Sequence, residues 1–125
     1  MTWQISKEFH FSASHRLNGL PDDHQCARMH GHNYILTVRL RDSILREPGF
    51  VLDYGEMTFV KEWADKMDHR HLNDIFDEMN PTSENIVFAL WEDFRDILDK
   101  MGLVGTKVDV GLSETPKTWA WFIED

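Results

Sequence analysis

Apolar and polar residues alternate along the first part of the chain. Alternation with a period of two is typical of a β-strand with one buried face, because successive side chains of a strand point to opposite sides. The pattern therefore predicts a strand over residues 3–15 with its odd-numbered face buried. That face carries Trp3, Ile5, Lys7, Phe9, Phe11, Ala13 and His15.

A second alternating segment predicts a strand over residues 30–41, with a buried even-numbered face. The residues between the two strands, 17–29, include Asn-Gly, Pro and Asp-Asp, which are typical of a loop. Two further strands are predicted over residues 104–114 and 118–123. The faces of these three strands carry His30, His32, Tyr34, Leu36, Val38 and Leu40, then Val104, Val108, Val110 and Leu112, then Trp119, Trp121 and Ile123.

Two segments between the strands have the three-to-four-residue spacing of amphipathic helices. The first begins after Asp53, which with Glu56 fits an N-terminal capping box, and it ends near Asp68. The second begins at Thr82 or Ser83 and ends near residue 101. The predicted buried stripes are Met57, Val60, Ala64 and Met67 in the first helix, and Ile86, Leu90, Phe94, Ile97 and Met101 in the second.

The order of these elements, ββααββ, predicts an α+β fold with one domain over residues 1–125. Short connections favour a four-stranded antiparallel sheet with both helices on one face. That arrangement leaves the other face and two sheet edges uncovered. A small domain with such surfaces often associates with further copies, so we expect a homo-oligomer.

Composition excludes several classes of partner. Lys and Arg number 13 against 22 Asp and Glu, a net charge of −9, which argues against nonspecific binding of nucleic acid. No apolar run reaches the length of a membrane span, and no secretory signal is visible, so we expect no membrane partner. A single cysteine excludes an intramolecular disulfide, which favours a cytoplasmic location.

The histidines are the strongest chemical signal, because seven occur in 125 residues. His15 ends the buried face of the first strand, and His30 and His32 begin the buried face of the second. If the two strands are antiparallel neighbours, the three imidazoles meet at one end of the sheet. Three neutral imidazoles with an open position are typical of a catalytic zinc site. The alternative is three unrelated histidines at a strand end and in a loop.

Three further features carry weaker signals. Glu114 ends the apolar face of the third strand, where it is either a ligand anchor or an ordinary rim charge. Cys26 precedes His30 by four residues; a thiolate beside a cation can act as a base or nucleophile, although a lone cysteine is often an inert apolar residue. Asp68 and His69 could form a base and the group that orients it, or simply stabilise a helix end.

Taken together, these motifs resemble the 6-pyruvoyltetrahydropterin synthase family. The matching segments are residues 11–17, 26–34, 68–69, 81–85 and 114–116, in the family's order and from residue 3 to the C-terminus. The resemblance implies the tunnelling fold, in which copies assemble into a barrel-like oligomer, typically a hexamer with sites at subunit interfaces. Three residues separate Cys26 from His30, and with the tail at 115–120 this spacing resembles the bacterial 6-carboxy-5,6,7,8-tetrahydropterin synthases of queuosine (7-deazapurine) biosynthesis.

That branch implies a zinc-dependent lyase, which converts 7,8-dihydroneopterin triphosphate to 6-carboxytetrahydropterin and releases acetaldehyde and triphosphate. By the same resemblance, His15, His30 and His32 bind Zn²⁺, and the catalytic residues are Cys26, Asp68 and His69. Glu114 binds the pterin edge. One alternative is a 6-pyruvoyltetrahydropterin synthase, which eliminates triphosphate without cleaving a carbon–carbon bond. Another is a non-catalytic pterin- or zinc-binding module.

Overall fold

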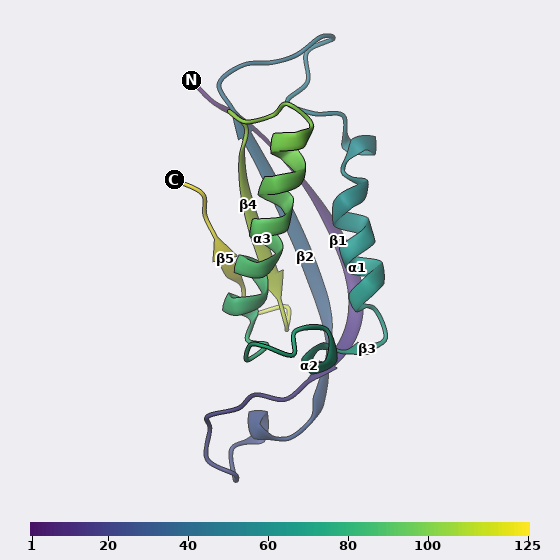
Figure 1. Ribbon diagram of the computed structural model, residues 1–125, viewed down its shortest axis with the longest axis vertical. Coiled ribbons are helices and arrows are strands. Elements are labelled where there is room, and N and C mark those ends of the chain that lie inside the picture. The colour runs from purple at the N-terminus through teal and green to yellow at the C-terminus, as the bar shows by residue number, and fades with distance from the viewer.

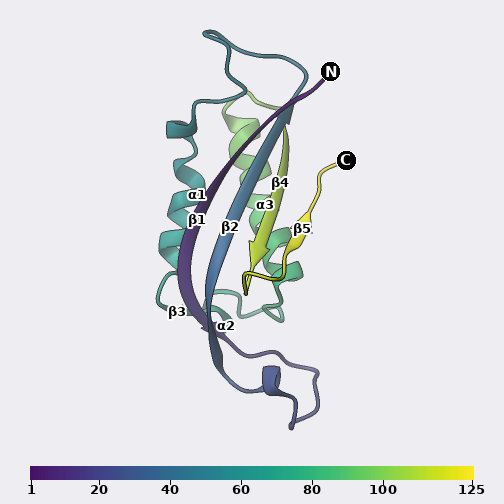
Figure 2. The same cartoon turned by 180° about the vertical axis from the view of Figure 1, so that it is seen from behind.

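A five-stranded mixed sheet forms the centre of the computed structural model, which describes residues 1–125. The strand order is β3-β1-β2-β4-β5, and helices α1 and α3 pack on one face of the sheet (Figure 1). The opposite face carries no helix (Figure 2). The strands are β1 (Trp3–His15), β2 (His30–Asp42), β3 (Arg70–His71), β4 (Lys107–Ser113) and β5 (Ala120–Phe122); the helices are α1 (Thr58–Met67), α2 (Leu72–Ile75) and α3 (Ser83–Lys100), with single turns η1 (Gln25–Ala27) and η2 (Tyr54–Glu56).

The two long strands confirm the predicted alternation. β1 and β2 are antiparallel, with Trp3 opposite Asp42 at one end and His15 opposite His30 at the other. β4 is antiparallel to β2 and so runs in the same direction as β1. The buried faces of these strands join the helices in one core of 24 residues, which includes Phe11, Leu36 and Leu112.

The prediction of a four-stranded, wholly antiparallel sheet is wrong, because β3 pairs parallel with the edge of β1. His69 has a φ of 58°, and its N–H donates to the carbonyl of Ser12, so the chain turns sharply after α1 and runs beside β1. A two-residue strand has too few positions to show alternation. The four-residue helix α2 follows β3 directly. It is too short to show the three-to-four-residue spacing by which a helix is recognised in a sequence.

The element boundaries also differ from prediction in several places. Asp53 caps the single turn η2, accepting from the Gly55 N–H at 2.9 Å, and α1 begins only at Thr58. Thr82 does cap α3, but Met101 is 41% exposed, and Leu98 is the last buried residue of the helix. β4 starts at residue 107 rather than 104, because the chain first has to turn back after α3. No helix has the length and apolar character needed to cross a membrane.

Candidate metal centre

Three histidines meet at one end of the sheet, as their positions on the two strands predict. His15 lies directly opposite His30, and His32 lies opposite Ala13 on the same face. One ring nitrogen from each of the three imidazoles lies within 4.8 Å of the others. Their rings are edge-on to one another, with centroids 4.6 to 5.1 Å apart. The spacing is that of ligands converging on a single point.

Hydrogen bonds to backbone carbonyls orient two of the rings. The Nδ1 atom of His15 is 2.8 Å from the Pro81 carbonyl, and that of His30 is 2.7 Å from the Arg28 carbonyl. A carbonyl can only accept, so Nδ1 carries the hydrogen and Nε2 keeps a free lone pair. This is the tautomer that a metal ligand requires.

The free nitrogens fit a metal better than they fit a purely structural role. His15 is fully buried, and neither its Nε2 nor the Nε2 of His32 has a hydrogen-bond partner. Burial lowers the pKa of both His15 and His32, which favours the neutral, metal-binding imidazole. An unpaired buried nitrogen is costly, and a divalent cation at this point would satisfy both of these atoms, with His30 as a third ligand.

Glu114 lies beside this cluster, just after β4. Its Oε2 is 3.5 Å from the Nε2 of His32, and its Oε1 accepts a hydrogen bond of 2.6 Å from the hydroxyl of Ser83. Both residues line a cavity of about 270 Å³ between the start of α3 and the segment that precedes β5. Ser83 was expected only as a possible helix cap. Its second role depends on a contact across 31 residues, for which the sequence carries no local signal.

Tyr34 is a further polar residue at this end that the sequence did not single out. It is 1% exposed, its ring stacks on Phe11, and its hydroxyl has no hydrogen-bond partner. Burial raises the pKa of Tyr34, and the charge of Glu114 raises it further, so the hydroxyl keeps its proton. The phenol therefore remains a potential donor beside the imidazoles.

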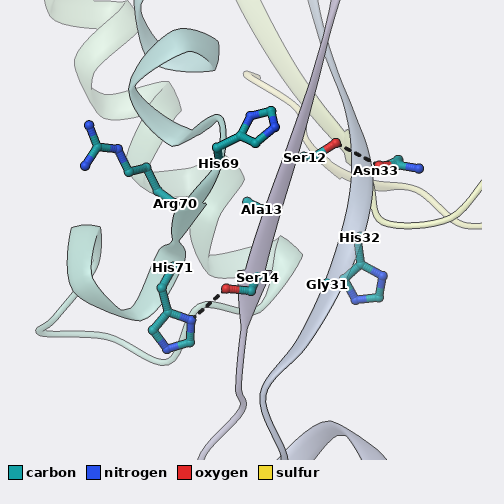
Figure 3. Close-up of a pocket in the computed structure, with 9 residues that line it drawn as sticks. All are labelled: Ser12, Ala13, Ser14, Gly31, His32, Asn33, His69, Arg70 and His71. Atoms are coloured by element: carbon teal, nitrogen blue, oxygen red, sulfur yellow. Dashed lines mark hydrogen bonds between the residues drawn. The ribbon is translucent and has the colours of Figure 1, made fainter.

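Asp68 and His69 form a pair at the edge of the sheet. Asp68 accepts the backbone N–H of Ser12 at 2.9 Å, and its other oxygen is 2.9 Å from the Nδ1 of His69. These two bonds, the one from Ser12 first, lower the pKa of Asp68 and keep it ionised. The His69 side chain is 82% exposed. In Figure 3 it lies on one side of β1, whereas His32 lies on the other.

Cys26 lies in η1, within the loop that joins β1 to β2 and extends beyond the sheet (Figure 1). Its N–H donates to the Nδ1 of His24 at 3.0 Å, and its carbonyl accepts from Leu17 at 2.8 Å. The thiol is partly exposed and is not a member of the imidazole cluster. The structure therefore brings Glu114 to the three histidines, and it leaves Cys26 and the Asp68–His69 pair outside this imidazole cluster.

Comparison with known proteins decides the family. The 6-pyruvoyl tetrahydropterin synthase family model matches residues 4–125. The chain belongs to this family. It is 31% identical to the 6-pyruvoyl tetrahydrobiopterin synthase of Pongo abelii, over 90% of this chain and 85% of that protein. It is 26% identical to the 6-carboxy-5,6,7,8-tetrahydropterin synthase of Bacillus subtilis, over 94% and 83%.

A further relative and a solved structure agree with this family. A 6-carboxy-5,6,7,8-tetrahydropterin synthase of Aquifex aeolicus is 29% identical over 69% of this chain, and the match spans 62% of that protein, less than two thirds of its length. The structure of Caenorhabditis elegans 6-pyruvoyl tetrahydropterin synthase superposes with a TM-score of 0.80 at 27% identity, covering 100% of this chain and 97% of that one. This likeness confirms the tunnelling fold of the family.

Proposed function

We propose that the protein is a zinc-dependent lyase, a 6-carboxy-5,6,7,8-tetrahydropterin synthase of queuosine biosynthesis. It converts 7,8-dihydroneopterin triphosphate and water to 6-carboxy-5,6,7,8-tetrahydropterin, acetaldehyde and triphosphate. The observation that carries the proposal is the imidazole cluster, with its unpaired nitrogens, next to a carboxylate held by Ser83. The first feature suits a Lewis acid, and the second suits a flat heterocycle.

The carboxylate of Glu114 orients the substrate. An ionised carboxylate accepts two parallel hydrogen bonds, and the amino-pyrimidine edge of a pterin offers two neighbouring N–H donors. The Ser83 hydroxyl fixes one carboxylate oxygen at 2.6 Å. The ring then enters the 270 Å³ cavity, and its side chain extends toward the imidazoles.

The three imidazoles are the proposed zinc ligands. A divalent metal held by His15, His30 and His32 would supply Lewis-acid chemistry, which makes the C–H bonds beside the substrate's side-chain oxygens more acidic. The lowered pKa values of His15 and His32 and the unpaired Nε2 atoms of these two rings support this assignment.

Cys26 and the Asp68–His69 pair move protons in this proposal. The thiolate of Cys26 removes a proton from the substrate side chain. His69 exchanges protons with the reacting oxygens, and Asp68, ionised and bonded to Nδ1, holds the ring and stabilises its cation. Because β1 lies between His69 and His32, we propose that a second copy completes the site at a subunit interface of a hexamer.

The alternative activity is that of a 6-pyruvoyl tetrahydropterin synthase, which retains the three-carbon side chain. The 6-pyruvoyl tetrahydrobiopterin synthase of Pongo abelii is 31% identical over 90% of this chain, which favours this reading. The short spacing between Cys26 and His30 favours the carboxy synthase. A non-catalytic binding module is a poorer fit, because every candidate acid, base and ligand is present.

A single incubation separates these readings. Zinc-loaded protein is mixed with 7,8-dihydroneopterin triphosphate, and the products are identified by mass. Acetaldehyde together with a carboxylated tetrahydropterin is the expected result. A product that retains all three side-chain carbons would instead establish the pyruvoyl synthase. Binding without turnover would establish a non-catalytic module.

A further inference from the structure

A second, larger cavity of about 470 Å³ lies beside β3, across the end of β1 (Figure 3). Only one of its nine lining residues is hydrophobic, and none is a carboxylate. They are Ser12, Ala13, Ser14, Gly31, His32, Asn33, His69, Arg70 and His71. Apart from His32, which belongs to the imidazole cluster, the cavity holds Arg70 and two further histidines and no acid, so it favours an anionic ligand even in a chain with a net charge of −9.

Arg70 is the strongest cation in this cavity, and it has no protein partner. It forms no ion pair and its side chain forms no hydrogen bond, whereas Arg41, Arg46 and Arg95 are all paired with carboxylates. A planar guanidinium with five free N–H donors matches the oxygens of a phosphate. Arg70 is therefore available to a ligand in a way that these other arginines are not.

His71 is oriented toward the same space by a serine. Its Nδ1 is 3.0 Å from the hydroxyl of Ser14, its neighbour across the β1–β3 pairing. When Ser14 donates to Nδ1, the hydrogen of the ring resides on Nε2, which then donates to a ligand. Arg70 and His71 also line an adjoining cavity of about 310 Å³ with Lys66, where Asp74 is the only acid.

We infer that Arg70 and His71 bind the triphosphate of the substrate. The inference rests on the proposed function and extends it by assigning the leaving group's site. The two residues directly follow His69, the proposed proton-transfer group. They therefore lie beside the same imidazole cluster as His69, whether that cluster belongs to this copy or to a neighbouring one. They neutralise the charge that accumulates on triphosphate as its C–O bond breaks, with the electron pair leaving on that oxygen.

The binding test uses inorganic tripolyphosphate as the probe and isothermal calorimetry on the intact oligomer. Arg70→Gln should weaken its binding by about tenfold or more, because a charge-assisted pair is lost. His71→Asn should weaken binding by a smaller factor. The matched control is Lys100→Gln, which removes one exposed charge from the far end of α3 and should leave binding unchanged. Equal affinity in wild type and Arg70→Gln would overturn the assignment.

A second measurement separates this inference from the proposed function. Affinity for a pterin without triphosphate should be the same in Arg70→Gln and wild type, and in turnover the KM for the triphosphate substrate should rise more than kcat falls. A loss of pterin affinity as large as the loss of tripolyphosphate affinity would overturn the assignment, because it would show a general disturbance. If tripolyphosphate binding depends on Arg70 but no turnover occurs, the anion site stands and the proposed function fails.

Discussion

The two ends of the central sheet differ in whether their buried polar groups have hydrogen-bond partners. At the end where β1 begins, Asp42 is 5% exposed and accepts from Thr106 at 2.7 Å, Arg46 at 3.0 Å and the Ile44 N–H at 3.1 Å. Beside it, Asp109 takes two bonds of 2.8 Å from Arg41. We call this network the paired end.

The opposite end, called the metal end, is defined by His15, His30, His32 and Glu114. Here two imidazole nitrogens and the Tyr34 hydroxyl are buried without a partner. A fold that needs only stability satisfies its buried polar groups, as the paired end does. Unpaired groups that converge on one point instead indicate a ligand, and the contrast makes the metal end the candidate functional site of the sheet.

The largest expected effect is on metal content. Replacing both His30 and His32 with alanine should reduce bound zinc from about one per chain to nearly none and abolish turnover, because a single imidazole cannot hold the ion. Elemental analysis of purified protein measures this directly. His10→Ala, which alters an exposed histidine on the same strand as His15, is the control and should keep its zinc. Full zinc in the double variant would contradict the assignment.

Cys26→Ala should reduce kcat by about 10² to 10⁴-fold, the typical cost of losing a general base. Zinc content and thermal stability should stay at the wild-type level, because Cys26 lies in a loop outside the imidazole cluster. Turnover and metal are measured on the same sample. Parallel loss of both would make Cys26 a metal ligand rather than a base.

At the paired end, Asp109→Ala should destabilise the fold by about 3 kcal/mol, since it leaves the Arg41 guanidinium without its carboxylate. Denaturant unfolding measures the change. Zinc content should not change, because this network lies at the opposite end of the strands. A variant that loses zinc while remaining stable would show that the two ends are not separate in function.

Glu114→Gln should weaken the binding of a triphosphate-free pterin by an amount on the order of 2 kcal/mol. The amide places a donor where the carboxylate had an acceptor, while the shape of the site is kept. Fluorescence titration compares the variant with wild type, with zinc content as the control. Unchanged affinity would make Glu114 a rim charge.

The smallest effect concerns acid stability. Burial alone would raise the pKa of Asp42, but the hydrogen bonds from Thr106 and Ile44 and the charge of Arg46 outweigh it and hold the pKa below 3.8. A lowered pKa stabilises the folded state above pH 3.8, and this contribution is lost as the pH falls through the folded value. Asp42→Asn should therefore show a shallower loss of stability in acid, measured by unfolding at a series of pH values. An unchanged slope would contradict this.

The sequence predicts the metal end better than it predicts the rest of the candidate site. Alternation over thirteen residues defines the faces of β1 and β2, so the convergence of His15, His30 and His32 follows from parity and pairing. The same reasoning places Glu114 at that end. Residue patterns do not predict β3, because a strand of two residues is too short to show alternation. The turn that leads into it depends on the positive φ of His69, which the sequence does not indicate.

Contacts between segments that are far apart in the sequence are also not predicted by residue patterns. The hydroxyl of Ser83 reaches Glu114 only because the start of α3 packs beside the end of β4, and Ser14 meets His71 only because β3 pairs with β1. The position of Cys26 depends on a loop whose path no short-range pattern specifies. Long strands with strict alternation are thus predictable, and loops and short edge strands depend on tertiary packing.

The most direct test of the account is X-ray absorption at the zinc edge of the metal-loaded protein. Three imidazole nitrogens at about 2.0–2.1 Å, with oxygen completing the coordination and no sulfur, is the spectrum that the account predicts. It would place zinc on the unpaired nitrogens of the metal end and leave Cys26 free to act as a base. A sulfur neighbour near 2.3 Å, or fewer than three imidazoles, would contradict it.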